Sequence, residues 1–232
     1  KGRKRNSAKD RTMQIEVEEK SDQSVISHSD SPIIDRYIIR KISRFITGLL
    51  IKTPVTPNQV TIISLILGIF SAAFFSHGAH TYTIIAGVFY FVSTVFDQCD
   101  GEVARFKHMT SDFGKTFDII VDSIVNATIT IGVTIAIYKT NGSSLTIIAG
   151  LLAMTGIVIS LLLTTYFSNE SKNDTGTKKM LDKLNNKDFF YIIMLVSVVF
   201  NQMIWFLLIM AIGTNIYWII HKIAHRKVSN GI

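Results

Sequence analysis

Long apolar runs, separated by short polar segments, make up most of the chain after residue 53. An α-helix needs about 20 mainly apolar residues to cross the ~30 Å hydrocarbon layer of a membrane. The pattern therefore predicts an all-α integral membrane protein with six transmembrane helices. The predicted helices are Pro57–Ser76, Thr81–Phe106, Gly114–Tyr138, Ser144–Phe167, Asp188–Phe200 and Met203–Ile220.

The last two predicted helices are the least regular part of this pattern. The fifth is short for a membrane span, and only Asn201 and Gln202 separate it from the sixth. A single long tilted helix in place of these two is therefore an alternative.

The first predicted helix has a well-defined start in the segment VTPNQV. Thr56 can cap the helix, Pro57 suits its first turn, and Gln59 can complete a capping box. Val55 and Val60 are spaced as a hydrophobic staple around this start.

Two different segments precede this helix. Residues 1–31 are polar and predict a linker or tether. In residues 32–52, apolar side chains recur at three- and four-residue spacing with Arg36, Arg40, Lys41 and Arg44 between them. This pattern predicts a basic amphipathic helix in the membrane interface, although an ordinary surface helix would show it too. Residues 53–228 then form the membrane domain. The chain begins at Lys1 rather than at a methionine, which is compatible with a longer native N-terminus.

Charge supports this topology and gives it an orientation. Of the 24 Lys and Arg residues, 23 fall on the side that the N-terminus would occupy, and Lys139 is the exception. Such an excess marks the cytoplasmic side. We therefore expect a multi-pass cell-membrane protein with both termini in the cytoplasm. The net charge of +7 reflects this topology and not a nucleic-acid surface, and the single Cys99 excludes an intrachain disulfide.

Four aspartates interrupt the second and third predicted helices. Asp97 and Asp100 are three residues apart, and Asp118 and Asp122 are four apart, so each pair shares one helical face. The connection between the two helices is short, which makes them antiparallel neighbours and brings the four carboxylates together at the cytoplasmic interface. Carboxylates that converge repel one another unless divalent cations bind them, and oxygen ligands suit Mg²⁺, Mn²⁺ or Ca²⁺.

The residues near the aspartates suit a phosphate ligand. Gly101 allows a ligand to approach the backbone closely, and Arg105 can bind a phosphate through two hydrogen bonds. Gly114 would open the third helix behind Ser111, a candidate cap. The alternative is a structural ion-pair cluster around Arg105, but four acids and one arginine do not balance. Glu102 is expected to face solvent or a basic loop.

The stretch DQCDGEVARFKHMTSDFGKTFDIIVD resembles the signature of CDP-alcohol phosphotransferases, D-x2-D-G-x2-A-R-x8-G-x3-D-x3-D. The resemblance extends over the six-helix region and includes the segment TPNQVT. All eight specified positions are met, by Asp97, Asp100, Gly101, Ala104, Arg105, Gly114, Asp118 and Asp122.

The resemblance implies a mechanism in which two Mg²⁺ or Mn²⁺ ions lie between the aspartates, with Asp122 as both ligand and general base. An acceptor hydroxyl would attack the β-phosphorus of a CDP-alcohol and expel CMP, in phospholipid, polar-lipid or inositol-phosphate synthesis. The resemblance also implies a homodimer. The implied metal ligands are Asp97, Asp100, Asp118 and Asp122, and the implied CDP-binding residues are Asn58, Thr61, Asp100, Gly101, Ala104, Arg105, Ser111 and Gly114.

The signature does not identify the acceptor or the alcohol on the donor. The basic segment before the first helix resembles archaeal-type members that are fused behind a cytidylyltransferase, some of which use CDP-inositol and inositol phosphate. A phosphorylated acceptor would need cations near the cytoplasmic face. The candidates for this role are Arg36, Arg40, Lys41, Lys178, Lys179 and Lys187.

Two other classes of protein would explain intramembrane acids. A membrane prenyltransferase would carry its aspartates on two separated loops and have more helices. A divalent-cation transporter would not need Gly101, Ala104, Arg105 and Gly114 at their spacing. Release of CMP from a CDP-alcohol would distinguish the enzyme from both.

Overall fold

The computed structural model describes residues 39–168 and 187–229, and all regular elements in these two ranges are α-helices. They are α2 (Arg40–Leu50), α3 (Pro57–Phe75), α4 (His80–Phe106), α5 (Asp112–Asn141), α6 (Ser144–Ser168), α8 (Lys187–Val199) and α9 (Met203–Ser229).

The helix boundaries follow local capping. The capping box at the start of α3 is confirmed, and Gln59 Oε1 accepts a hydrogen bond from the Thr56 backbone N–H at 2.9 Å. A break separates α8 from α9, with Asn201 in the left-handed region at φ 52°. The predicted cap Ser111 is confirmed, but α5 begins at Asp112 and not at Gly114 and ends at Asn141 and not at Tyr138. The largest departure is α9, which continues past Ile220 to Ser229.

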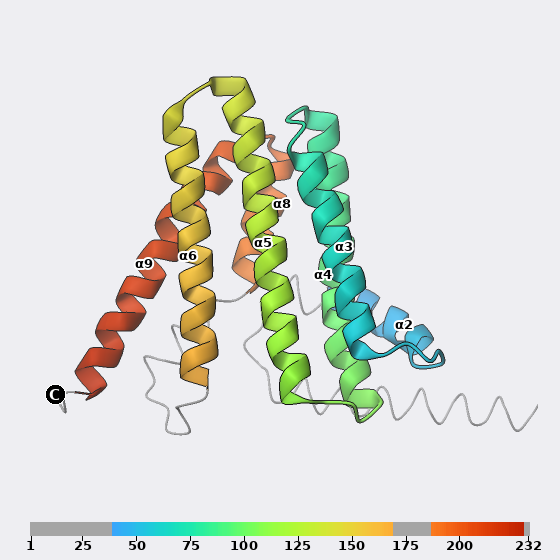
Figure 1. The fold of residues 1–232 in the computed structure, drawn as a ribbon. Coiled ribbons are helices and arrows are strands. Elements are labelled where there is room, and N and C mark those ends of the chain that lie inside the picture. Colours follow the sequence, from blue (N-terminus) through green and yellow to red (C-terminus); the bar gives the residue numbers. More distant parts are fainter. Residues whose placement is uncertain (1–38, 169–186, 230–232) are drawn as a thin grey trace, which may run out of the picture.

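Helix α3 packs against both α4 and α5; α3 and α4 form one side of the described structure and α6 and α9 the other, with α5 between them (Figure 1). Helix α6 packs against α5 and α9, while α8 lies between α4 and α9. The contact between α3 and α5 is especially close at Gly132, where a Cβ atom would collide with the backbone carbonyl of Ala72. A residue without a side chain is required there for the two backbones to meet.

Three helices of the described residues, α3, α4 and α5, are long and apolar enough to cross a membrane. The apolar stretches described in α6, α8 and α9 are shorter, so the predicted count of six spans is not confirmed. Many large apolar side chains point outward, for example Phe70, Val88 and Leu151, each about half exposed. An outer surface of this kind suits lipid better than water.

The signature residues are brought to one end of the helices. Figure 1 shows α2, the α4–α5 connection and the C-terminal ends of α6 and α9 at that end, while the α3–α4 and α5–α6 connections lie at the opposite end. The C-terminal half of α4 and the N-terminal half of α5 therefore lie at the same end, where both helices pack against α3 and α2 packs against α4.

Helix α2 docks on α4 through polar groups. The hydroxyls of Ser43 and Thr47, both fully buried, donate hydrogen bonds of 3.0 and 2.7 Å to the two carboxylate oxygens of Glu102. The prediction that Glu102 faces solvent is therefore wrong, because this carboxylate supplies the acceptors that two buried hydroxyls need. On the other side of α2, Phe45 is 71% exposed and Leu49 is 55% exposed.

The connection from α2 to α3 is held to the same helix. Lys107, at the end of α4, donates hydrogen bonds of 2.7 Å to the backbone carbonyls of Thr53 and Val55. Together with Glu102, this lysine fixes α2 and the start of α3 relative to the C-terminal turns of α4.

Candidate active site

Three of the four aspartates form a compact group. One carboxylate oxygen from each of Asp97, Asp100 and Asp118 lies within 4.8 Å of the others, a grouping that can hold a metal ion. Asp97 and Asp100 come from α4 and Asp118 from α5. The predicted direct packing of these two helices is not what brings the carboxylates together, because each helix packs mainly against α3 and the side chains meet between them. Such a set of hard oxygen ligands suits Mg²⁺, Mn²⁺ or Ca²⁺.

Helix α3 positions one of these carboxylates. Thr61 is buried, and its hydroxyl donates a hydrogen bond of 2.5 Å to Asp100 Oδ2. Asp100 itself is only 5% exposed. Thr61 was expected to line the CDP site, and its contact in the structure is with the carboxylate of a predicted metal ligand.

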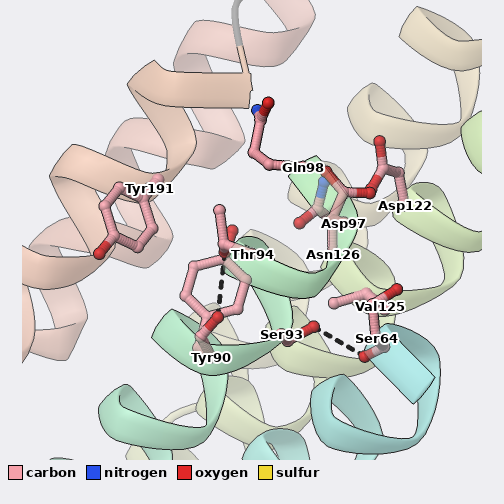
Figure 2. Close-up of a pocket in the computed structure, with 10 residues that line it drawn as sticks. All are labelled: Ser64, Tyr90, Ser93, Thr94, Asp97, Gln98, Asp122, Val125, Asn126 and Tyr191. Atoms are coloured by element: carbon pink, nitrogen blue, oxygen red, sulfur yellow. Dashed lines mark hydrogen bonds between the residues drawn. The ribbon is translucent and has the colours of Figure 1, made fainter. Parts of the chain in front are cut away.

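Asp122 lies one helical turn after Asp118 and outside the group of three. It lines a pocket together with Asp97 (Figure 2). The oxygens Asp97 Oδ1, Asp118 Oδ1 and Asp122 Oδ2 are buried and accept no hydrogen bond in the described part of the chain, although each residue makes another polar or electrostatic contact. Buried carboxylate oxygens of this kind fit a cation site.

The pocket next to Asp97 and Asp122 runs between α3, α4, α5 and α8. Its other polar walls consist of hydroxyl and carboxamide side chains. The lining residues are Ser64, Tyr90, Ser93, Thr94, Asp97, Gln98, Asp122, Val125, Asn126 and Tyr191.

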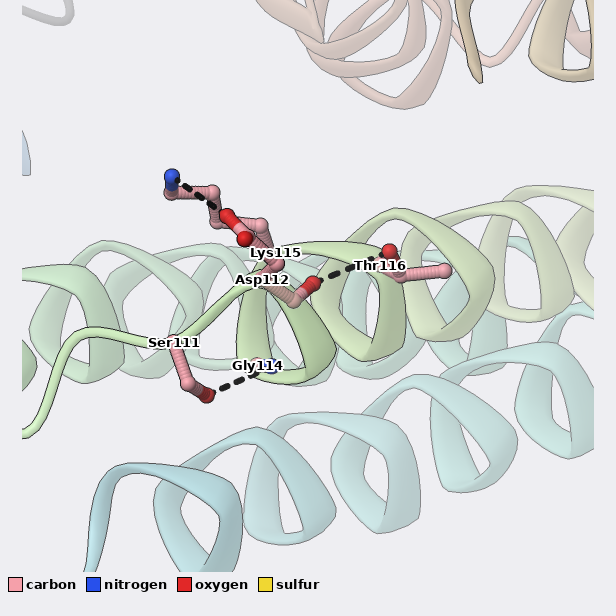
Figure 3. Close-up of polar contacts among 5 residues, drawn as sticks. All are labelled: Ser111, Asp112, Gly114, Lys115 and Thr116. Atoms are coloured by element: carbon pink, nitrogen blue, oxygen red, sulfur yellow. Dashed lines mark hydrogen bonds and ion pairs between the residues drawn. The ribbon is translucent and has the colours of Figure 1, made fainter. Parts of the chain in front are cut away.

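The start of α5 forms a second part of the site (Figure 3). The hydroxyl oxygen of Ser111 accepts a hydrogen bond of 3.0 Å from the Gly114 backbone N–H, and Asp112 pairs with Lys115 at 3.1 Å on the exposed side. A Cβ atom on Gly114 would lie 3.1 Å from Ser111 Oγ and 3.6 Å from Asn58 Oδ1. Three of the predicted CDP-binding residues are therefore neighbours. Ser111 and Gly114 lie at the N-terminus of α5 and Asn58 at that of α3, and helix N-termini favour anions.

The remaining CDP-binding candidates lie on the last turns of α4. The exposed Arg105 folds back along the helix, with its guanidinium 3.6 Å from the position of a Cβ on Gly101. Ala104 is partly buried in the turn between them. The arginine is close to the backbone of Gly101 and accessible from outside, as a phosphate-binding arginine must be.

The candidate acceptor residues are only partly placed. Arg40 is half-buried and Lys41 is exposed, both on α2. Lys187 is the first residue of α8. Arg36, Lys178 and Lys179 lie outside the described residues.

Sequence reasoning missed the two carboxamides that line the pocket. Gln98 directly follows Asp97, and Asn126 is one helical turn after Asp122. Helical spacing from the aspartates was the signal for Asn126, because positions 118, 122 and 126 lie on one face of α5.

Comparison with known proteins identifies relatives of most of the helical region. A model of the CDP-alcohol phosphatidyltransferase family matches residues 54–220. A protein of Thermococcus kodakarensis named "Bifunctional IPC transferase and DIPP synthase" is 27% identical over 205 residues, which cover 84% of this chain and 46% of the relative. A protein of the same name from Archaeoglobus fulgidus is 38% identical over 105 residues, 44% of this chain and 20% of the relative. The chain thus spans less than half the length of these relatives.

A solved structure has the same fold. The phosphatidylinositol phosphate synthase of Mycobacterium tuberculosis, crystallised with CDP-DAG bound, superposes with a TM-score of 0.61. The superposition covers 78% of this chain and 89% of that protein at 18% sequence identity.

Proposed function

The chain belongs to the CDP-alcohol phosphatidyltransferase family, and from this membership we propose that it transfers a substituted phosphate from a CDP-alcohol to an acceptor hydroxyl and releases CMP. The observation that carries the proposal is the grouping of Asp97, Asp100 and Asp118 next to the Gly101–Arg105 turn and the capped start of α5. These are the parts that a nucleoside diphosphate substrate requires: sites for cations, a close backbone approach and an anion-binding helix end.

The donor set fits divalent metal ions. Asp97, Asp100, Asp118 and Asp122 would hold two Mg²⁺ or Mn²⁺ ions, and Thr61 would fix the Asp100 carboxylate for this role. When bound, such ions neutralise a diphosphate and stabilise the charge that develops on the leaving phosphate.

The residues of this chain supply the rest of the reaction. Asp122 accepts the proton of the acceptor hydroxyl, because its carboxylate lines the pocket next to Asp97. The freed oxygen forms a bond to the β-phosphorus of the donor, and the bond from this phosphorus to the CMP oxygen breaks. Arg105 and the N-terminal turn of α5 bind the CDP portion, with Asn58, Gly101, Ala104, Ser111 and Gly114 around it.

We propose a general class of substrates and one more specific alternative. Synthesis of a phospholipid or another polar lipid is the general proposal, and an inositol-phosphate transferase that uses CDP-inositol is the alternative. The names of the relatives describe two activities in one protein of about twice this length, which favours a cytidylyltransferase attached N-terminal to residue 1. The solved neighbour binds CDP-DAG, which keeps a diacylglycerol donor open.

We place the protein in the cell membrane with six spans, and with both termini and the site in the cytoplasm. Residues 1–31 would be a linker, 32–52 an interfacial segment that includes α2, and 53–228 the membrane domain. The exposed Phe45 and Leu49 of α2 would enter the lipid interface. A homodimer is a further prediction from the family.

The direct test is CMP release. Purified protein with Mg²⁺ would be incubated with CDP-inositol or CDP-diacylglycerol and, in turn, inositol phosphate, glycerol phosphate and serine. We expect CMP to form with at least one pair, and EDTA to stop the reaction reversibly. Turnover that persists in EDTA would contradict the metal mechanism, and lack of CMP with every pair would favour a transporter or a prenyltransferase.

If the acceptor carries a phosphate, α2 supplies cations near the site. Replacing Arg40 or Lys41 by Gln should then raise the acceptor KM about 10-fold at one of the two positions, through loss of a charge-assisted hydrogen bond. The KM for the CDP-alcohol should stay constant. Unchanged acceptor KM values in both variants would exclude α2 from the acceptor site.

A further inference from the structure

The pocket next to Asp97 and Asp122 contains two carboxamides whose polar atoms are available to a ligand. Neither the Gln98 nor the Asn126 side chain hydrogen-bonds to another residue in the described part of the chain; the backbone carbonyl of Asn126 accepts from Thr130. Both lie within long apolar helices, where a polar side chain without a partner is costly. Figure 2 shows them around the pocket with Asp97 and Asp122.

The other polar groups of the pocket mainly accept hydrogen bonds. The hydroxyls of Ser64, Ser93 and Thr94 already donate to backbone carbonyls, at 2.7, 2.7 and 3.0 Å, so their oxygens retain only acceptor capacity. The carboxylates of Asp97 and Asp122 are acceptors when ionised. A ligand of this pocket can therefore donate hydrogen bonds to these oxygens, while the two carboxamides and the phenolic hydroxyls of Tyr90 and Tyr191 can both donate and accept.

The charge of the pocket limits the ligand further. Its lining contains no Lys or Arg side chain, so the proposed divalent ions would be the cationic partners of any phosphate there, and these ions are proposed to bind the diphosphate of the donor. An ammonium group would meet the divalent ions that the neighbouring carboxylates are proposed to hold, and like charges repel. A neutral group with several hydroxyls satisfies both conditions. The cavity volume of about 30 Å³ exceeds what one water molecule needs.

We propose that Gln98 and Asn126 form a binding site for the hydroxyl groups of a polyhydroxylated alcohol, carried by either the donor or the acceptor. This inference rests on the proposed function, because it assigns the pocket to a substrate of that reaction. The alcohol extends from the reacting phosphate into the pocket, where its hydroxyl groups bind the two carboxamides. The site thereby selects alcohols that carry several hydroxyls over alcohols that carry one.

The test replaces each carboxamide by an apolar side chain of similar size. In Gln98→Leu and Asn126→Leu, KM should rise roughly 3- to 10-fold for the substrate whose alcohol enters the pocket, as one hydrogen bond is lost. CDP-inositol and inositol phosphate are varied separately, so the affected KM identifies donor or acceptor. CDP-cyclohexanol and cyclohexanol phosphate, which lack the additional hydroxyls, should show no such rise.

Matched controls lie outside the pocket. Gln202→Leu, between α8 and α9, and Asn141→Leu, at the end of α5, make the same chemical changes at exposed positions and should leave both KM values unchanged. Equilibrium dialysis with the Asp122→Asn protein, which should bind without turnover, gives the dissociation constants directly. They should rise by the same factor when Gln98→Leu or Asn126→Leu is added.

Equal losses for the polyol and the cyclohexanol substrates would overturn the inference, as would unchanged constants for both. If the variants do not fold, the wild-type protein still decides. It should prefer CDP-inositol to CDP-cyclohexanol, or inositol phosphate to cyclohexanol phosphate, and equal use of both within each pair would refute the site. A preference for an amino alcohol would do so too. A wild-type protein that releases no CMP would overturn the proposed function itself.

Discussion

At the scale of single residues, the four aspartates have different surroundings, so their replacement should affect different properties of the enzyme. Asp97, Asp100 and Asp118 share one compact group, whereas Asp122 lies outside it beside the pocket. Loss of a residue that hydrogen-bonds to a metal ligand typically costs roughly 10- to 100-fold in activity. Replacing any of the first three aspartates by Asn removes a proposed ligand itself and should therefore cost more. Titration of CMP release with Mg²⁺ should show weaker metal binding.

Asp122→Asn should instead lower kcat by roughly 10²- to 10⁴-fold, the usual contribution of a general base, with a smaller change in Mg²⁺ dependence. Asp112→Asn is the matched control, because that carboxylate is fully exposed and pairs with Lys115 at the surface. Near wild-type turnover in any of the four aspartate variants at saturating Mg²⁺ would remove that residue from the mechanism.

Thr61 supports a different prediction, since it acts through Asp100. Thr61→Val removes the hydroxyl that donates to Asp100 Oδ2 and keeps the side-chain volume. The apparent affinity for Mg²⁺ should fall roughly 10- to 100-fold, and excess Mg²⁺ should restore most of the activity. Thr61→Ser keeps a hydroxyl and should behave like wild type. A loss in Thr61→Val that Mg²⁺ does not restore would mean that Thr61 contacts the nucleotide.

The aspartates could be predicted from the sequence, but the role of Thr61 could not. Helical spacing alone places Asp97 with Asp100, and a short connection keeps the start of α5 at the same end as the end of α4. The contact between Thr61 and Asp100 depends on how α3 is rotated against α4, and the apolar residues of α3 do not encode this. They surround most of the helix, so no single face is marked as buried.

At the scale of elements, the docking of α2 on α4 is a buried polar contact. Ser43→Ala with Thr47→Val would leave the half-buried Glu102 carboxylate without the two hydroxyl donors that it has in the structure. The free energy of unfolding should fall by about 1–3 kcal/mol, the cost of a buried polar group that loses its partner. Adding Glu102→Leu should restore much of this loss, since an interface without unsatisfied polar groups is nearly neutral.

Unfolding of the purified protein in detergent, titrated with SDS, measures both changes. Thr53→Val is the control, because its hydroxyl donates only to the exposed Leu50 carbonyl. If the triple variant were less stable than the double variant, the Glu102 contact would contribute more than donor satisfaction.

Element boundaries were predictable where the caps are local. Thr56 and Gln59 specify the start of α3 within four residues of sequence. The docked face of α2 was not predictable, because the periodicity of residues 32–52 marks an apolar face toward lipid but not a partner for Ser43 and Thr47. Glu102, the partner, is 55 residues further along the chain than Thr47. A contact between residues this far apart in the sequence depends on the packing of the helices, so local sequence patterns do not predict it.

At the scale of the whole molecule, the signature residues, α2 and the ends of α6 and α9 lie at one end of the helices. Among the described residues, Arg40, Lys41, Arg44, Arg105, Lys107 and Lys115 lie on the elements at this end, and the opposite end has Lys139, which donates to the Ser76 carbonyl at 2.9 Å. The positive-inside rule then predicts that the first end faces the cytoplasm. The orientation is testable, and so is the span count that α6, α8 and α9 leave open.

Single cysteines introduced in a Cys99→Ser background can report both. Ser143→Cys lies between α5 and α6, Gln202→Cys lies between α8 and α9, and Thr175→Cys lies between α6 and α8. With six spans, an impermeant maleimide should label the first two in intact cells and the third only after permeabilisation, while the Cys99→Ser parent stays unlabelled. Labelling of Ser143→Cys and Thr175→Cys from the same side would show that α6 does not cross the membrane. If only Ser143→Cys were labelled from outside, α8 and α9 would not be separate spans. Helix α8, which supplies Tyr191 to the pocket, would then not cross the membrane by itself.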